Sequence, residues 1–243
     1  MDFSWTPEQT ALRERTIAFA REQLTPGLAR RAPEDCFPRD LWKACGEYGI
    51  LRAFVPPAYG GNGWDIVTTV AMLEALGYGC RDNGFTLALN AQLWTIQEPL
   101  LTFGSDEQKS RYLPGMCDGT LIASHAVTEP ESGSDAFSLQ TTAEKSGDAY
   151  ILNGRKTYVG LAPIADVALV FANTQPDMGK WGVSVFLVDA GTPGFTQAPA
   201  MEKMGLYTNP IGELIFENCR VGEQNRVGGE GVGVSLFNAT MDW

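Results

Sequence analysis

Ten residues near the middle of the chain combine hydroxyls, carboxylates and glycine in a pattern that suits a polar ring edge or a phosphate. They run Ala126-Val127-Thr128-Glu129-Pro130-Glu131-Ser132-Gly133-Ser134-Asp135. The apolar run at 121–127 predicts a strand, which breaks at the Thr-Glu-Pro sequence into a polar loop. Such a loop presents hydroxyls and backbone N–H groups to a ligand. Most Ser/Gly-rich windows of this length are surface turns, so the loop alone does not establish a site.

A second segment makes the prediction more specific. It runs Tyr150-Ile151-Leu152-Asn153-Gly154-Arg155-Lys156-Thr157-Tyr158-Val159. A TEPxxGSD segment followed by NGxKxY resembles the flavin-binding middle domain of the acyl-CoA dehydrogenase family. Further segments in the family's order are Met1-Asp2-Phe3, residues 55–61, residues 103–109, Tyr112-Leu113-Pro114 and Gly229-Glu230-Gly231.

The resemblance implies an FAD-dependent oxidoreductase that desaturates an acyl thioester between its α and β carbons. The acyl group would be carried on CoA or on an acyl carrier protein, as in fatty acid metabolism. The resemblance also implies an electron-transfer flavoprotein or similar acceptor, and a homo-oligomer that is a dimer or a homotetramer.

Seven residues match cofactor-binding positions of the family: His125, Val127, Thr128, Ser134, Tyr158, Val159 and Gly160. By resemblance, Val127 and Thr128 meet the pyrimidine side of the flavin, and Ser134 also lies near the phosphopantetheine arm of the substrate. Tyr158 and Val159 match an aromatic–apolar pair that lies against the ring system.

Two residues depart from the family pattern. Gly160 stands where most members carry a Thr or Ser whose hydroxyl bonds flavin N5, and Leu161 replaces the usual asparagine. Neutral drift and altered flavin chemistry both explain this departure. If glycine is present because of its backbone angles, threonine would not fit there.

No catalytic base is assigned within the chain. The family's catalytic glutamate is expected beyond Trp243, so the chain alone is expected to be inactive. Glu129 is expected to fix its turn. His125, the single histidine, is expected to be a hydrogen-bonding wall beside the cofactor rather than a base.

The sequence predicts an α+β fold in which helices come first and strands follow. Thr6-Pro7-Glu8-Gln9 is a capping box, and Ser105 with Gln108 caps a short helix. Helices are also predicted from Pro38 to Gly49, over 66–76 and after Asp82. Short strands are predicted at 141–145, 150–156, 167–173, 183–188 and 213–216. Their close spacing indicates an antiparallel β-barrel or sandwich, and the resemblance favours the barrel.

The predicted domains are a helical domain at 1–120, a flavin-binding β domain at 121–228 and the start of a third domain at 229–243. The last segment has Val234, Phe237 and Met241 at helical spacing. By resemblance it opens a C-terminal four-helix bundle that this chain lacks.

Composition excludes several classes of protein. A net charge of -11 argues against nucleic-acid binding. A single histidine excludes any multi-histidine metal site. No apolar run has membrane-spanning length, and the N-terminus shows no signal-peptide pattern. Five widely spaced cysteines suit buried, reduced thiols in a cytoplasmic protein.

Two alternatives to the dehydrogenase remain open. A flavin oxidase or monooxygenase on the same scaffold would react directly with oxygen, and Gly160 favours it. A truncated, non-catalytic assembly subunit would explain the absent bundle.

Overall fold

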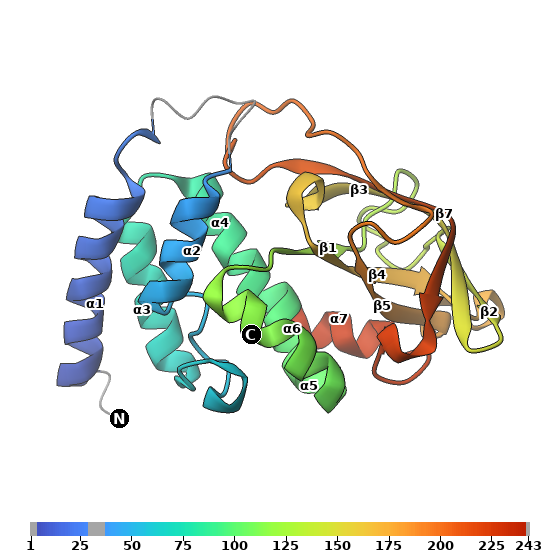
Figure 1. Ribbon diagram of the computed structural model, residues 1–243, viewed down its shortest axis with the longest axis horizontal. Helices are drawn as coiled ribbons and strands as arrows, with labels where there is room; N and C mark the ends of the chain where they lie inside the picture. Colours follow the sequence, from blue (N-terminus) through green and yellow to red (C-terminus); the bar gives the residue numbers. More distant parts are fainter. Residues whose placement is uncertain (1–3, 29–36, 242–243) are drawn as a thin grey trace.

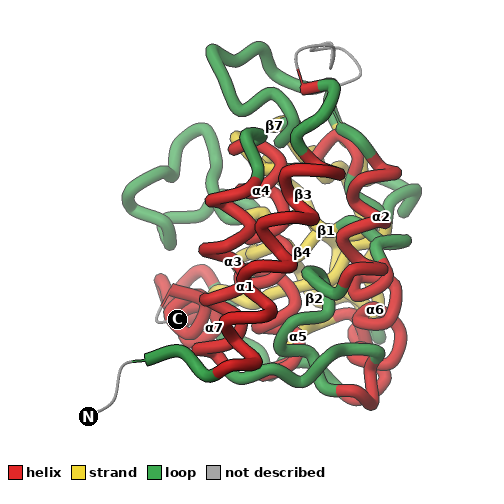
Figure 2. Tube along the Cα trace, turned by 90° about the vertical axis from the view of Figure 1, so that its left-hand side faces the viewer, coloured by secondary structure: helices red, strands yellow, loops and turns green. Residues whose placement is uncertain are grey.

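The computed structural model describes residues 4–28 and 37–241 of the chain. Within these ranges, a helical layer packs beside a β-sheet, and the first half of the chain forms the helices (Figure 1). Figure 2 shows α1, α2 and α3 in front of the strands. The predicted α+β class is confirmed. The predicted features at Met1-Asp2-Phe3, Cys36 and Trp243 lie outside the described residues.

The described residues of the helical layer form six α-helices: α1 (Pro7–Phe19), α2 (Arg39–Tyr48), α3 (Ile66–Gly79), α4 (Asn83–Gln92), α5 (Glu98–Phe103) and α6 (Asp106–Asp118). Short π-helical segments, Ala20–Leu24 and Leu93–Gln97, follow α1 and α4. The side chains at the centre of this layer include Trp42 and Phe85, whose rings meet edge to face at 5.9 Å. Burial of such aromatic rings supplies much of the stabilisation of a helical core.

The helix ends follow the local sequence signals. Thr6 and Gln9 form both hydrogen bonds of a capping box, and Ser105 and Gln108 form a second. Gly49 ends α2 with φ 108°, a left-handed conformation that glycine adopts without strain. The helix after Ser105 is longer than predicted and reaches Asp118. It continues because its later turns are buried in the core, through side chains that include Tyr112, Leu113, Met116 and Cys117.

From residue 121 to residue 241 the chain forms eight strands: β1 (Ala123–Ala126), β2 (Thr142–Ser146), β3 (Ala149–Gly160), β4 (Val167–Asn173), β5 (Val183–Asp189), β6 (Phe195–Gln197), β7 (Ile211–Gly222) and β8 (Arg226–Val227). Their order is β6-β7-β3-β2-β4-β5-β8, with β1 paired to β4. Most pairs are antiparallel, but β1 runs parallel to β4. The sheet stays open, so "barrel" describes it only loosely. The predicted turn between β2 and β3 is present, with Gly147 at φ 65°.

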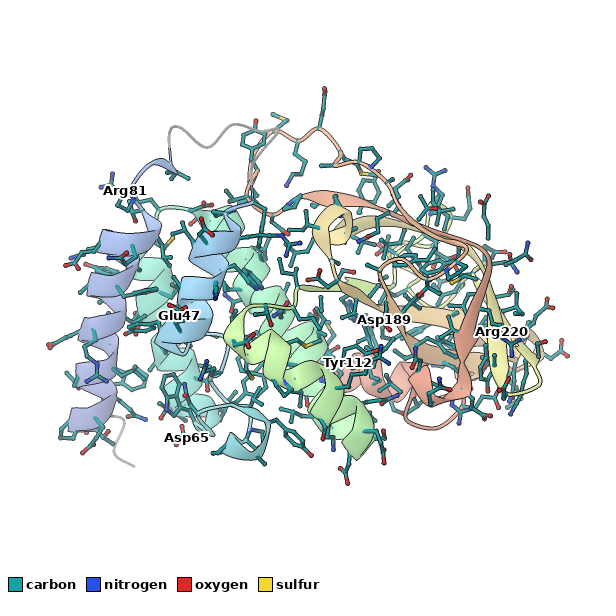
Figure 3. All side chains as sticks on the ribbon, in the orientation of Figure 1. Glu47, Asp65, Arg81, Tyr112, Asp189 and Arg220 are labelled. Atoms are coloured by element: carbon teal, nitrogen blue, oxygen red, sulfur yellow. The ribbon has the colours of Figure 1, made fainter. Side chains whose placement is uncertain are left out.

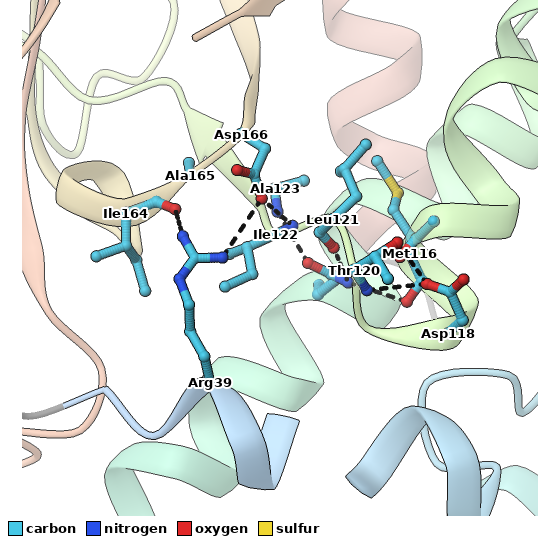
Figure 4. A network of polar contacts seen from close by, with 12 residues as sticks. Arg39, Met116, Asp118, Thr120, Leu121, Ile122, Ala123, Ile164, Ala165 and Asp166 are labelled. Atoms are coloured by element: carbon cyan, nitrogen blue, oxygen red, sulfur yellow. Dashed lines mark hydrogen bonds and ion pairs between the residues drawn. The ribbon is translucent and has the colours of Figure 1, made fainter. Parts of the chain in front are cut away.

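Polar contacts join the helical layer to the sheet at the start of β1. Arg39 on α2 donates to the carbonyl of Ile164 at 2.8 Å and lies 3.8 Å from the Asp166 carboxylate. Asp166 in turn accepts the backbone N–H of Ile122 at 2.8 Å (Figure 4). At the same end of the sheet, where Asp189 on β5 pairs with Val167 on β4, Tyr112 on α6 donates to Asp189 at 3.0 Å (Figure 3). These bonds fix β1 relative to the helices.

The last described helix, α7 (Gly233–Met241), packs against α5 and β5. Of the predicted apolar face, Val234 is buried, Phe237 is half-buried and Met241 is 53% exposed. The ring of Phe237 meets Phe137 and Phe171 edge to face, at 5.3 and 6.3 Å. The helix therefore rests on the sheet at the position where the two predicted chemical segments meet.

Candidate functional site

The two segments singled out from the sequence form the walls of one cavity of about 220 Å³. The cavity is lined by His125, Val127, Thr128, Gly133, Ala136, Thr157, Tyr158, Val159, Phe237 and Met241. Five of the seven predicted cofactor-binding residues are thus together: His125, Val127, Thr128, Tyr158 and Val159. They come from the end of β1, the loop after it and the end of β3. The backbone hydrogen bond from Thr157 N to Thr128 O, at 2.9 Å, joins these elements directly.

Ser134 and Gly160 are not among the residues that line the cavity. Ser134 is exposed on the loop after β1, one residue beyond Gly133. Gly160 is the last residue of β3, next to Val159. Leu161, which replaces the family's asparagine, is buried and packs into the core of the helical layer. Its side chain therefore stabilises the junction between helices and sheet.

A buried ion pair holds the loop of the cavity in place. Lys156 Nζ lies 2.7 Å from Glu129 Oε1 and also donates to the carbonyl of Val127 at 3.0 Å. The same carboxylate accepts the backbone N–H groups of Gln140 and Thr141, at 2.5 and 3.0 Å. This geometry confirms that Glu129 fixes the turn. Because it is saturated by these donors, it is unsuited to act as a base.

The environment of the pair keeps both partners charged. Burial raises the pKa of Glu129, but the Lys156 ammonium and the hydrogen bonds outweigh it, and the net result is a lowered pKa. Burial lowers the pKa of Lys156, and the nearby carboxylate partly offsets this effect. A buried pair of this kind is costly to break, because the remaining charge has no partner.

His125 forms part of the wall of the cavity, and its hydrogen-bonding role toward the cofactor stays a prediction. Its ring meets Phe171 edge to face at 5.2 Å, and Nε2 has no hydrogen-bond partner among the described residues. Burial, and secondarily the charge of Lys156, lowers the pKa of His125 to about 4. The imidazole is therefore neutral near pH 7 and a weak proton acceptor.

Tyr158 presents its ring at the mouth of the cavity through an unusual backbone. Its φ is 54°, in the left-handed region, and its side chain is 70% exposed. The register of β3 against β7 shifts between Lys156 and Val159, so the strand bulges at this residue. Bulky residues rarely adopt this conformation, and it is often found where strain serves a site. The bulge therefore coincides with an exposed aromatic ring at the cavity.

Sequence reasoning missed half of the residues that line the cavity: Gly133, Ala136, Thr157, Phe237 and Met241. Phe237 and Met241 are four residues apart on α7, and their helical spacing was interpreted only as a core stripe. Nothing local in the sequence shows that α7 packs over the loop after β1. That contact depends on the tertiary fold.

The chemistry of the lining suits a flat, neutral, polar ring. Hydroxyls of Thr128 and Thr157, the backbone of Gly133, and an aromatic face on Tyr158 surround it, and no residue in the lining carries a charge near pH 7. A flavin ring system fits this set. Within residues 4–28 and 37–241 there is no cluster of residues able to hold a metal ion. Among those same residues, none of the helices has the length and apolar character needed to cross a bilayer.

Two sequence-family models match consecutive parts of the chain. "Acyl-CoA dehydrogenase, N-terminal domain" matches residues 6–120, and "Acyl-CoA dehydrogenase, middle domain" matches residues 124–219. The second match contains both cavity segments.

Individual proteins also resemble the chain over its whole length. An "L-prolyl-[peptidyl-carrier protein] dehydrogenase" from Serratia sp. is 38% identical over all of this chain and 63% of its own length. The solved structure "Crystal Structure of the Prolyl Acyl Carrier Protein Oxidase AnaB" is 46% identical with a TM-score of 0.96, over 99% of this chain and 64% of that one. "PigA with FAD and proline" is 38% identical with a TM-score of 0.96, over 100% and 63%. The chain thus spans under two thirds of these relatives.

Proposed function

Because the chain belongs to the acyl-CoA dehydrogenase family, we propose that it forms the N-terminal and middle parts of an FAD-dependent enzyme that desaturates an acyl thioester. The observation that carries the proposal is the cavity itself. Five predicted flavin contacts, from segments more than 20 residues apart in sequence, line one site of suitable chemistry. We divide the chain into domains at 1–120, 121–228 and 229–243.

When bound, FAD supplies an acceptor for the hydride that leaves the β carbon. The residues of this chain bind and orient it: Thr128 offers a hydroxyl, Val127 a backbone edge and Tyr158 a ring face. Neutral His125 excludes water on the β1 side. Ser134, exposed beside the cavity, is assigned to the thioester arm of the substrate. Gly160, at the end of β3, is the last of the seven residues that we assign to FAD or to the substrate.

Removal of the α proton of a thioester requires a positioned base, since this proton is weakly acidic. Glu129 is committed to Lys156, and His125 is a weak base in its buried setting. We therefore assign no base among residues 1–243 and expect it in the part of the whole protein that this chain does not span.

The substrate class that the relatives favour is a prolyl group on a carrier protein. One solved structure in this group was determined with FAD and proline. A relative at 38% identity is named an L-prolyl-[peptidyl-carrier protein] dehydrogenase, and a solved structure at 46% identity is named a prolyl acyl carrier protein oxidase. Acyl-CoA remains the alternative thioester.

A second candidate, a flavin oxidase, is favoured by Gly160. This residue removes the side-chain hydroxyl expected next to flavin N5, and one relative is named an oxidase. In the dehydrogenase, electrons would pass to an electron-transfer flavoprotein or similar acceptor. In the oxidase, they would pass to oxygen.

Three further features belong to the same proposal. We expect a homo-oligomer, a dimer or a tetramer, as in the family. The four cysteines of the described residues are buried and form no disulfide (Cys45, Cys80, Cys117 and Cys219), which suits the reducing cytoplasm. A non-catalytic assembly subunit is the alternative if no catalytic part exists beyond this chain.

The whole protein, purified and loaded with FAD, provides the test. Carrier protein charged with proline should bleach the flavin under anaerobic conditions, whereas butyryl-CoA should bleach it slowly or not at all. The rate at which oxygen reoxidises the reduced flavin then distinguishes the two enzymes, because an oxidase is reoxidised quickly by oxygen and a dehydrogenase slowly. A protein that binds no FAD, or whose FAD no thioester bleaches, contradicts the proposed function.

A further inference from the structure

Asn209 has a buried side-chain oxygen that no described residue satisfies. The residue is 5% exposed, and its Oδ1 has no hydrogen-bond partner among the residues that the structure describes. A buried polar atom without a hydrogen-bond partner destabilises the folded protein, so such atoms are uncommon and call for an explanation. A bound ligand that supplies the missing partner is one such explanation.

The loop that carries Asn209 is held firmly in place. Between β6 and β7 this loop reaches from the sheet toward α4 (Figure 1). Lys203 Nζ donates to the carbonyls of Leu206 and Asn209, at 2.8 and 2.5 Å. Asn209 N donates to Leu206 O at 3.0 Å, and the Thr208 hydroxyl donates to buried Asp82 at the start of α4. The unsatisfied amide therefore sits in a defined place and not on a loose loop.

That place is directly against Gly160. A Cβ added to Gly160 would lie 3.3 Å from Asn209 Oδ1 and 3.5 Å from its Nδ2. The backbone at Gly160 is not in the left-handed region, so its φ does not require glycine. Any side chain at residue 160 would instead meet the Asn209 amide. The asparagine thus occupies the space that a side chain at residue 160 would fill.

We propose that Asn209 is a cofactor-positioning residue whose side-chain amide provides the polar contact to the flavin edge that a hydroxyl at residue 160 would otherwise provide. The inference rests on the proposed function. Gly160 directly follows Val159, which lines the cavity, and the Asn209 amide lies against Gly160 at that end of β3, next to the lining residues though not among them. An amide carries both donors and an acceptor, and rotation by 180° exchanges them. It can therefore donate to a ring nitrogen as a hydroxyl does.

Single substitutions in the whole protein test the contact. Asn209→Ala should weaken FAD binding by about fivefold or more, which is the effect of losing one hydrogen bond. It should also lower the midpoint potential of the bound flavin, because a donor stabilises the electron-rich reduced ring. Asn90→Ala is the matched control, since the Asn90 side chain only donates to Thr86 O within α4. It should change neither quantity.

A double substitution tests whether a hydroxyl at residue 160 can replace the side-chain amide of Asn209. Gly160→Ser alone should weaken FAD binding, because its side chain meets Asn209. Gly160→Ser combined with Asn209→Ala supplies a hydroxyl in the vacated space and should restore the FAD dissociation constant to within about twofold of the original. A purely structural role for Asn209 predicts additive losses and an unchanged potential.

The outcomes separate this inference from the proposed function. If the unmodified protein binds no FAD, the proposed function fails. If it binds FAD and folded Asn209→Ala binds it equally well, with the same potential, only the role of Asn209 is wrong. Should Asn209→Ala fold poorly, Asn209→Asp keeps the size of the side chain, and an unchanged flavin potential in that variant overturns the inference.

Discussion

The ammonium group of Lys156 lies 2.7 Å from the carboxylate of Glu129, and both side chains are almost fully buried. The pair joins β3 to the turn after β1, the two elements that line the cavity. The side chains of Lys156 and Glu129 are 0% and 2% exposed. The other ion pairs of the described residues are at the surface or partly exposed. The cavity therefore depends on a charged contact in the interior of the protein.

Lys156→Met should cost about 3–5 kcal/mol in the free energy of unfolding, because it leaves the Glu129 carboxylate buried without its cation. Urea unfolding of the two proteins measures the difference. Lys145→Met is the matched control, since Lys145 pairs with Glu223 at the surface and should cost at most about 1 kcal/mol. Equal costs for the two variants would show that the buried pair has no special role.

His125 should make stability depend on pH. Its pKa is lowered from 6.5 to about 4, first by burial and then by the charge of Lys156. As the pH falls, His125 of the unfolded chain therefore binds a proton near pH 6.5, whereas His125 of the folded chain binds it only near pH 4. Stability is full above about pH 6.5 and is lost as the pH falls toward 4, by at most about 3 kcal/mol.

His125→Phe removes this contribution and keeps the edge-to-face contact with Phe171. Urea unfolding at about pH 7 and about pH 5 should show a smaller loss of stability in the variant than in the unmodified protein. The carboxylates titrate in both proteins, so the difference isolates the histidine. Parallel pH profiles would mean that the imidazole is hydrated in the folded state.

Much of the fold could be predicted because its signals are local. Thr6 with Gln9 and the glycine at 49 mark helix ends within a few residues of sequence. The turn at Gly147 and the apolar runs of β4 and β5 are equally local. The open edge of the sheet and the parallel pairing of β1 with β4 depend on contacts between distant strands, which no local pattern specifies.

The site was predictable only in part, for the same reason. Family-like spacing identified Thr128 and Tyr158, but not the left-handed backbone of Tyr158, which is rare for a bulky residue. The glycine at 160 was visible in the sequence, whereas the amide of Asn209 beside it comes from a loop 49 residues later in the chain. The contact between the rings of His125 and Phe171 depends on the pairing of β1 with β4, which no local pattern specifies.

Thr128→Val should weaken FAD binding by the whole protein by about 1 kcal/mol, because it removes a hydroxyl and keeps the side-chain shape. Ser134→Ala is its comparison, because Ser134 is exposed and does not line the cavity. That variant should raise the apparent KM for the thioester more than it changes flavin content. Fluorescence titration with FAD and steady-state kinetics measure the two effects. Unchanged FAD affinity in Thr128→Val would place the hydroxyl away from the flavin.

Tyr158→Gly should separate stability from cofactor binding. The left-handed backbone at φ 54° costs a bulky L-residue about 1–2 kcal/mol, and glycine relieves this at an entropic cost of about 0.5–1 kcal/mol. Because the ring is 70% exposed, little packing is lost, and the variant should be more stable by up to about 1 kcal/mol. FAD binding should weaken, since the aromatic face is gone. Tyr158→Phe keeps that face and should retain the cofactor.

Asn218→Gly is the control for the backbone effect. Asn218 has nearly the same φ, 51°, but asparagine tolerates this conformation, and its backbone N–H bond to Asn153 survives the substitution. It should change stability by only a few tenths of a kcal/mol and leave FAD binding unaltered. If Tyr158→Gly instead destabilised the protein while FAD binding was unchanged, the exposed ring would serve packing. The bulge in β3 would then not have been retained for the cofactor.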